Sequence, residues 1–171
     1  MERYEDFWQI TDAALRSAVQ QLSLQATDRQ LDRLMQAYLF PAAFAEVRRA
    51  LESLKGSPLA ILSNGSPEML NSAVRKNGLD SYFAEIISVD LVKTYKPSPR
   101  VYALGPRILN LPATEILFVS SNSWDAAGAK AYGYQVCWCN RSGTQGENWG
   151  FAPDFTVRGL DQIAEVLAGK F

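Results

Sequence analysis

The residues best suited to chemistry follow three short apolar runs of the 171-residue sequence. After the run "AIL", Ser63 and Asn64 offer a hydroxyl and an amide, and Gly65 precedes a helix that is expected to begin at Pro67. Backbone N–H groups at a helix start, together with such side chains, suit an anion such as a carboxylate or phosphate. The alternative is a capped turn between a strand and a helix, in which these residues have a purely local role.

A lysine and a tyrosine follow the second apolar run, in the segment "YKPSPRVY". Prolines stiffen the loop around Lys96. A lysine held near a strand end can balance a buried carboxylate or a negative transition state, although a solvated surface lysine is the simpler alternative. Tyr102 falls on the first turn of the next helix, where it either shares the pocket or packs in the core.

The third run ends in "SSNSWD", which contains Ser120, Asn122, Trp124 and Asp125. A helix rich in alanine and glycine follows and is able to pack closely against a sheet. The alternative for Asp125 is an N-terminal cap, since the helix dipole favours a carboxylate there. Trp124 forms either an apolar wall or a surface contact. Because the carboxyl ends of parallel strands share one edge of a sheet, we predict that the three segments form one site.

The elements that would position these residues are indicated by hydrophobic periodicity. The residue types at Thr27 and Asp28 suit the start of a helix. Short apolar runs alternate with helical patterns from about residue 58, which is typical of a parallel sheet covered on both faces. We predict helices over 3–22, 28–39, 42–56, 67–77, from 99, near 125–132 and over 160–169, and strands over 58–63, 85–89, 115–120, 134–140 and 154–157.

These patterns predict an α/β fold with a Rossmann-like, doubly wound parallel sheet. Residues 1–40 are expected to form a partial helical cap, and residues 41–171 the core domain. The length suits one hydrophobic core rather than two full domains.

Composition excludes several classes of protein. The chain has no histidine, which rules out histidine triads and histidine-ligated zinc. Its net charge of −1 indicates neither nucleic acid nor an anionic membrane as a partner. No apolar run is long enough to span a bilayer, and the first ten residues are unlike a signal peptide. We interpret the two cysteines, Cys137 and Cys139, as reduced residues of a cytoplasmic protein.

Together, the segments "LAILSNGSPEML", "SVDLVKTYKPSPRVYAL" and "ILFVSSNSWDAAGAKAYGYQVCWCNR" resemble the haloacid dehalogenase superfamily, and within it the (S)-2-haloacid dehalogenase (type II) branch. The resemblance implies a core with a helical cap and a small 2-haloacid as substrate. It also implies that an aspartate displaces the halide and that water then hydrolyses the aspartyl ester. Family members are commonly dimers, so a homodimer is possible.

The resemblance also implies roles for the residues above. Ser63 and Asn64 would bind the substrate, and Lys96 would balance the charge of the nucleophile. Tyr102, Ser120 and Asn122 would position groups around that nucleophile. Asp125 would orient or activate the hydrolytic water. Asn122 and Trp124 would border the halide pocket.

Metal use separates this branch from the phosphatases of the same superfamily, which usually hold Mg²⁺ with further acidic residues at the third strand end. Here Asp125 is the only carboxylate in that loop, and a hard dication prefers several oxygen ligands. We therefore expect dehalogenation without a metal or other cofactor. The alternatives are a phosphatase of the superfamily and a non-catalytic remnant that acts as a binding module.

The chain departs from the family pattern at the nucleophile. The family begins with a strand that ends in an Asp-x-Tyr-Gly-Thr type motif, and no such segment occurs here. Asp90 ends a strand but matches a different position. In the family that first strand lies between those ending at Ser63 and Ser120, so the core is expected to lack its first central strand. A mis-assigned start, a fragment or a short protein that has lost catalysis would explain this, and the chain as given is expected to be inactive.

Overall fold

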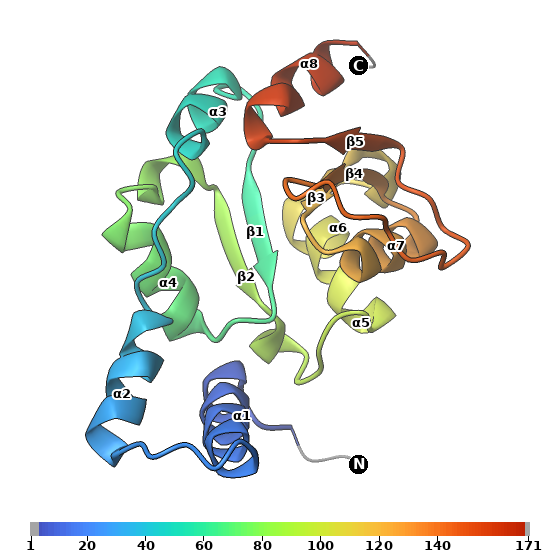
Figure 1. Cartoon of the computed structure of the whole chain (residues 1–171). Coiled ribbons are helices and arrows are strands. Elements are labelled where there is room, and N and C mark those ends of the chain that lie inside the picture. The colour runs from blue at the N-terminus through green and yellow to red at the C-terminus, as the bar shows by residue number, and fades with distance from the viewer. Residues whose placement is uncertain (1–3, 170–171) are drawn as a thin grey trace. The chain divides into compact units, whose positions relative to one another are not determined.

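The computed structural model describes residues 4–169, which form an α/β fold with parallel strands in two sheets (Figure 1). The chain divides into two compact units. Unit 1 comprises the described part of Met1–Ala43 together with Leu59–Lys93. Unit 2 comprises Phe44–Pro58 together with the described part of Thr94–Phe171.

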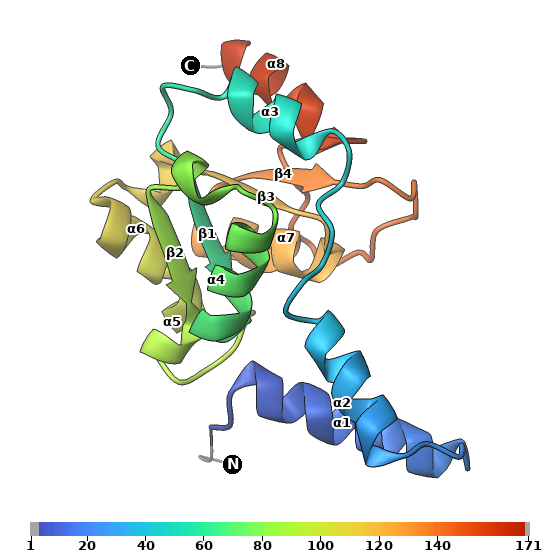
Figure 2. The same cartoon turned by 90° about the vertical axis from the view of Figure 1, so that its left-hand side faces the viewer.

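Unit 1 begins with two helices whose starts are fixed by side chains. Asp6 and Thr27 each form a capping box, with Gln9 and Gln30 respectively, which confirms the helix start predicted at Thr27. The two strands of this unit pair in parallel, with Ser63 opposite Ser88. Helix α4 lies against this sheet (Figure 2). The elements are α1 (Phe7–Gln21), α2 (Asp28–Ala37), β1 (Ala60–Ser63), α4 (Pro67–Lys76), η1 (Asp80–Tyr82), β2 (Glu85–Ser88) and η2 (Val89–Leu91).

Unit 2 carries a three-stranded parallel sheet in the order β3-β4-β5. Helix α7 packs on β3 and β4, and α3 packs beside α8 (Figure 1). The elements are α3 (Val47–Ser53), α5 (Pro99–Tyr102), α6 (Leu104–Leu109), η3 (Ala113–Glu115), β3 (Leu117–Ser120), α7 (Ser123–Tyr132), β4 (Gln135–Cys139), β5 (Phe155–Val157), η4 (Leu160–Gln162) and α8 (Ile163–Ala168).

All five predicted strands are present, and most predicted helices are found within a few residues of their expected bounds. The helix expected over 42–56 is wrong in its first part, because α3 begins only at Val47. The preceding segment is held by side-chain contacts instead. The Phe44 ring lies 4.2 Å from the Arg141 guanidinium carbon, and Glu46 pairs with the same arginine.

The predicted α/β class and the parallel strands are confirmed, but the strands form two sheets rather than one. Within residues 4–169, β1 pairs only with β2, and β3 pairs only with β4. Among the described residues, β1 and β3 therefore each have one edge that pairs with no strand. This agrees with the expectation that the first central strand, which would lie between them, is not part of these residues. The division of the chain near residue 40 into cap and core stays a prediction.

The core of unit 2 is built around β3, β4 and the helices that cover them. Tyr102, Leu104 and Val136 are fully buried. Cys137 and Cys139 are unbonded thiols in one buried cluster with Val157 and Ile163. Among the described residues, no helix has the length and apolar character needed to cross a membrane.

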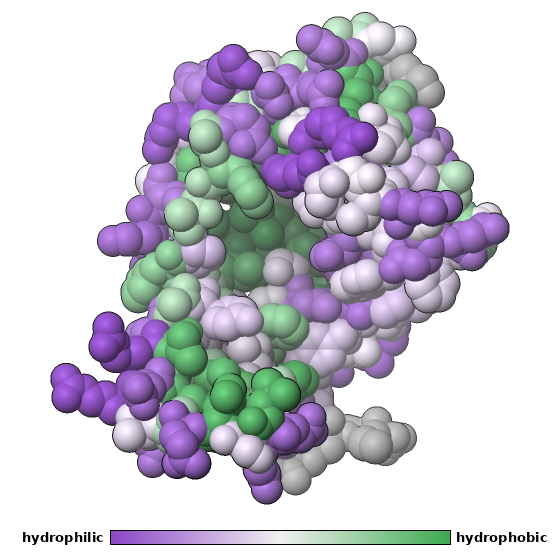
Figure 3. Space-filling model, viewed as in Figure 1, coloured by the Kyte–Doolittle hydropathy of each residue, from purple (hydrophilic) through white to green (hydrophobic). Residues whose placement is uncertain are grey.

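The helical pair α1 and α2 leaves much of its apolar surface uncovered. Figure 3 shows apolar side chains gathered over these helices. Leu34 on α2 is about half exposed, and so, or more exposed, are four residues that follow the two helices, namely Leu22, Leu24, Tyr38 and Phe40. Contiguous apolar surface of this kind commonly marks an interaction face.

Candidate active site

Asp125 is the centre of a buried polar network in unit 2. The ammonium of Lys96 lies 3.0 Å from Oδ2 of Asp125, and the two side chains are only 7% and 6% exposed. Ser120 donates its hydroxyl to the same oxygen at 2.9 Å, and Tyr102 donates to Oδ1 at 2.8 Å. These four sequence-predicted residues are therefore together, and Lys96 is not the solvated lysine of the simpler alternative.

The network draws on four parts of unit 2. Ser120 is the last residue of β3, and Asp125 is the third residue of α7. Lys96 lies in the loop before α5, and Tyr102 is the last residue of that helix. The N-cap of α7 is Asn122, and it makes no side-chain capping bond. The capping alternative for Asp125 is therefore wrong, because its carboxylate is engaged by three side-chain donors instead.

Small residues on α7 are required by the approach of Tyr102. A methyl group built on Gly128 would lie 2.5 Å from the Tyr102 hydroxyl and 3.1 Å from Cβ of Pro97. Ala126, Ala127 and Ala129 on the same helix are buried. The small residues that were predicted to let this helix pack against the sheet thus also let Tyr102 approach it closely enough to bond with Asp125.

The protonation of the network is shaped by burial. Burial lowers the pKa of the Lys96 ammonium, and the charge and hydrogen bond of Asp125 oppose that change. Burial also raises the pKa of the Tyr102 hydroxyl, and the neighbouring Asp125 carboxylate raises it further. Tyr102 is therefore a neutral hydrogen-bond donor at any physiological pH.

Two aromatic residues that sequence analysis missed support the network. Phe118 lies on β3 two residues before Ser120, so both side chains project from the same face of the strand. The Lys96 ammonium lies 4.8 Å from the centre of the Phe118 ring. Tyr134 donates its hydroxyl to the backbone oxygen of Tyr102 at 2.6 Å. The sequence did contain a signal for Phe118, because a residue two positions before Ser120 on a strand is expected to share its face.

Ser63 and Asn64 lie at the end of β1, in unit 1. The Ser63 hydroxyl accepts a hydrogen bond from the Gly65 N–H at 3.1 Å, and Ser88 donates to the Gly65 carbonyl at 2.7 Å. The α4 helix is capped by Ser66. These contacts fit the local turn that was the alternative for Ser63. The convergence of Ser63 and Asn64 with the Asp125 network stays a prediction.

The remaining predicted residues lie on the loop between β3 and α7. Asn122 donates its backbone N–H to the Ser120 hydroxyl at 3.2 Å, and its side chain is exposed. Trp124 is 37% exposed. Their predicted place beside a halide pocket stays a prediction.

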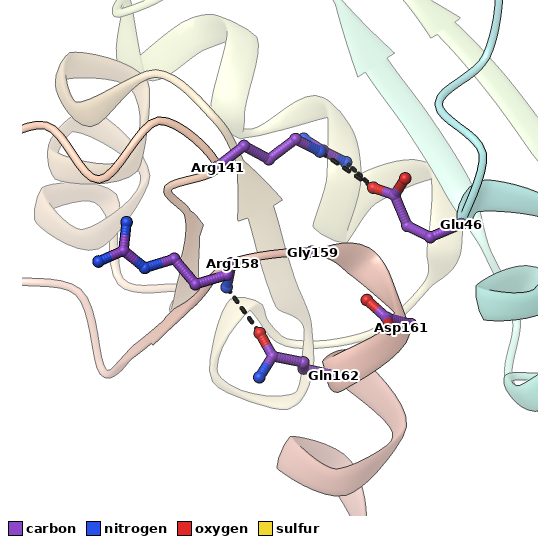
Figure 4. A pocket seen from close by; sticks show the side chains of 6 residues that line it. All are labelled: Glu46, Arg141, Arg158, Gly159, Asp161 and Gln162. Carbon is purple, nitrogen blue, oxygen red and sulfur yellow. Dashed lines mark hydrogen bonds and ion pairs between the residues drawn. The ribbon is translucent and has the colours of Figure 1, made fainter.

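A pocket of about 450 Å³ lies elsewhere in unit 2, and Figure 4 shows its lining. Arg141, after β4, reaches Glu46 with two nitrogens, at 2.9 and 3.0 Å, and also donates to the Ser121 hydroxyl at 3.1 Å. This arginine was not among the residues for which a role was predicted. The pocket is lined by Glu46, Arg141, Arg158, Gly159, Asp161 and Gln162, none of which was predicted as a site residue. Within residues 4–169, no group of three His, Cys, Asp or Glu side chains is placed to hold a metal ion.

Comparison with known proteins decides the family. The model of the haloacid dehalogenase-like hydrolases matches residues 1–133. The chain belongs to this family. The resemblance drawn from the three motif segments is therefore confirmed.

Haloacid dehalogenase-like relatives in several bacteria are similar over nearly the whole chain. The chain is 44% identical to haloacetate dehalogenase H-2 of Moraxella sp. over 98% of its length and 76% of that protein. It is 45% identical to the (S)-2-haloacid dehalogenase of Pseudomonas sp. strain YL, over 99% of its own length and 75% of the relative. The chain thus spans about three quarters of these two relatives.

Solved haloacid dehalogenases share the fold. L-2-haloacid dehalogenase RSc1362 is 40% identical with a TM-score of 0.94, over 96% of this chain and 74% of that one. The L-2-haloacid dehalogenase of Xanthobacter autotrophicus, with chloropropionic acid covalently bound, is 34% identical with a TM-score of 0.92. That match covers 99% of this chain and 78% of the other. The predicted Rossmann-like core is thus confirmed as a partial core of this family.

Proposed function

We propose that the chain supplies the charge-balancing and water-orienting part of an enzyme that dehalogenates small (S)-2-haloalkanoic acids by hydrolysis. The observation that carries the proposal is the buried Lys96–Asp125 pair, with Ser120 and Tyr102 on the same carboxylate. The nucleophile would be an aspartate on a strand that carries the family motif, for which residues 1–171 offer no match.

The network suits an aspartyl-ester mechanism. The nucleophilic carboxylate attacks the carbon that bears the halogen, and the halide leaves with the bonding electrons. The Lys96 ammonium would attract that carboxylate and keep it ionised. Water then adds to the ester carbonyl, which releases the hydroxy acid and restores the aspartate.

Asp125 is better suited to orient this water than to act alone as a strong base. An ionised carboxylate offers about four acceptor positions. Lys96, Ser120 and Tyr102 occupy three of them. About one position then remains for a water molecule, which fixes its direction of approach to the ester.

The substrate would be held by groups that include the end of β1. We propose that Ser63, Asn64 and nearby backbone N–H groups bind the carboxylate of the haloacid, and that Asn122 and Trp124 border the halide. The names of the two relatives, a haloacetate dehalogenase and an (S)-2-haloacid dehalogenase, support this class of substrate. The exposed apolar surface of α1 and α2 supports a homodimer. The reduced, buried cysteines support a cytoplasmic location.

A phosphatase is the second candidate. A HAD phosphatase from Thermococcus onnurineus is 26% identical with a TM-score of 0.68 over 88% of this chain. Phosphatases of the superfamily usually hold Mg²⁺ with further acidic residues, and the loop after β3 holds only one carboxylate, Asp125. Because one carboxylate is a poor set of ligands for Mg²⁺, this loop favours the dehalogenase over the phosphatase.

The test measures halide release from (S)-2-chloropropionate by two proteins. One is the 171-residue chain, and the other carries an upstream segment with an Asp-x-Tyr-Gly-Thr motif. We expect release only from the longer protein, and a loss of at least about a hundredfold in its Lys96→Met and Asp125→Asn variants. Near-normal turnover in both variants would remove the proposed roles. Phosphate release from p-nitrophenyl phosphate that requires Mg²⁺ would favour the phosphatase, and inactivity of both proteins in both assays would favour a binding module.

A further inference from the structure

The ring of Phe118 forms one wall of the space that holds the Lys96 ammonium. The nitrogen lies 4.8 Å from the ring centre and 3.0 Å from Oδ2 of Asp125. Phe118 is nearly buried, and the Lys96 side chain is only 7% exposed. The ammonium thus has a carboxylate and an aromatic face among its close neighbours, in a site with little access to solvent.

The Phe118 ring is itself held in place. It meets the Tyr102 ring edge to face, with ring centres 5.8 Å apart and planes at 80°. The Tyr134 ring lies 5.2 Å from it on centres. Tyr134 is fixed in turn by its bond to the Tyr102 carbonyl and by the close backbone of Gly105, where a methyl group would lie 2.3 Å from its hydroxyl. The ring therefore has little freedom to turn away from Lys96.

We propose that Phe118 is a positioning residue that holds the charged side chain of Lys96 against Asp125. The face of an aromatic ring carries a partial negative charge, which attracts an ammonium and has no such attraction for a neutral amine. The ring therefore favours the cation without adding an anion that would compete with a catalytic carboxylate. The value of this arrangement to catalysis rests on the proposed function, whereas the effect on Lys96 does not.

Groups on three elements affect the charge of Lys96. Asp125 on α7 favours the charged form, and Ser120 on β3 and Tyr102 on α5 compete for the same carboxylate. Burial opposes the charge. Phe118 adds a second favourable contact, which offsets part of the loss of hydration.

The test changes the electrostatics of the ring while keeping its shape. Phenylalanine with one, two or three ring fluorines is incorporated at position 118 of the 171-residue chain. Lysine labelled with ¹³C at Cε reports the protonation of Lys96 by NMR, and its signal is assigned by its disappearance in Lys96→Met. We expect the proton affinity of Lys96 to fall stepwise with each added fluorine, by about threefold to tenfold over the series.

A matched series at Phe155 is the control. Phe155 packs against the cluster of Cys137, Cys139, Val157 and Ile163 on another part of the sheet. The same substitutions there should leave the Lys96 titration unchanged. A Lys96 titration that does not depend on the fluorine content of position 118 overturns the proposal. This measurement needs no halide release, so a lack of halide release by the longer protein would count against the proposed function and not against the role of Phe118.

Discussion

The ammonium of Lys96 and the carboxylate of Asp125 form an ion pair at 3.0 Å, with less than a tenth of either side chain exposed. Removing one member of a buried pair leaves the other charge uncompensated, whereas removing both avoids that penalty. Loss of either member alone is therefore expected to destabilise unit 2, in addition to its effect on the proposed chemistry.

The first prediction concerns this pair. Lys96→Met and Asp125→Asn are each expected to lower the free energy of unfolding by about 3 kcal/mol, and the double variant by clearly less than the sum. Urea unfolding followed by tryptophan fluorescence measures all three. The exposed pair Lys55–Glu52 is the control, since Lys55→Met should change stability by less than about 0.5 kcal/mol. Strictly additive losses at Lys96 and Asp125 would contradict the prediction.

The contact between α7 and Tyr102 gives a second prediction. Gly128→Ala should lower the unfolding free energy by about 2 kcal/mol, because the added methyl group would lie 2.5 Å from the Tyr102 hydroxyl. Tyr102→Phe in the same chain should restore only part of this loss. The ring carbon Cζ and Cβ of Pro97 would still lie 3.1 Å from the new methyl group.

A second glycine–tyrosine contact, between Gly105 and Tyr134, serves as the comparison for that experiment. Here the methyl group would lie 2.3 Å from the hydroxyl, but 3.4 Å from the next ring atom, which is an ordinary contact. Tyr134→Phe should therefore rescue Gly105→Ala more completely than Tyr102→Phe rescues Gly128→Ala. Equal rescue at the two sites would show that the hydroxyl contacts do not explain the need for glycine.

The third prediction concerns Arg141 and Glu46, which are 95 residues apart in the sequence. Each side chain is about one fifth exposed. A double-mutant cycle with Arg141→Gln and Glu46→Gln should give a coupling of about 0.5–1 kcal/mol. Arg141→Lys should keep only part of this coupling, because a lysine cannot reproduce the contacts of both guanidinium nitrogens with Glu46. A coupling of zero would show that solvent screens the pair completely.

The fourth prediction is a loss of stability in alkali. Burial raises the pKa of the Cys137 thiol from 9.0 to about 11. Between these pH values the folded chain keeps a proton that the unfolded chain has lost, so the free energy of unfolding falls as pH rises through the window. The thiol contributes about 2 kcal/mol of this loss. The raised pKa values of Tyr102 and Tyr134 act in the same direction at higher pH, and the lowered pKa of Lys96 acts in the opposite one.

Cys137→Ala isolates the contribution of the thiol. Unfolding is measured at about pH 8 and about pH 11 for both proteins, and the variant should lose about 2 kcal/mol less between them than the parent chain. Cys139→Ala should show a smaller difference, because the nearby Arg141 opposes the effect of burial on the pKa of that thiol. An identical alkaline loss in the parent and Cys137→Ala would contradict the prediction.

The sequence by itself determined the order of the elements, the parallel strands and the family. These follow from local signals, namely short apolar runs, cap residues such as Thr27, and the motif segments around Ser63, Lys96 and Asp125. The absence of histidine also limits the chemistry that the chain can perform. Such signals are readable because neighbours in the chain fix turns, caps and strand faces.

Only the tertiary structure decided what those residues do to one another. Asp125 could have been a helix cap, and it became the acceptor for Lys96 and Tyr102, which are 29 and 23 residues away in the sequence. The place of the Phe118 ring beside the Lys96 ammonium, 22 residues away in the sequence, is likewise a tertiary contact. The physical reason is that burial and charge pairing depend on contacts between distant segments, and the local pattern of a chain does not contain those contacts.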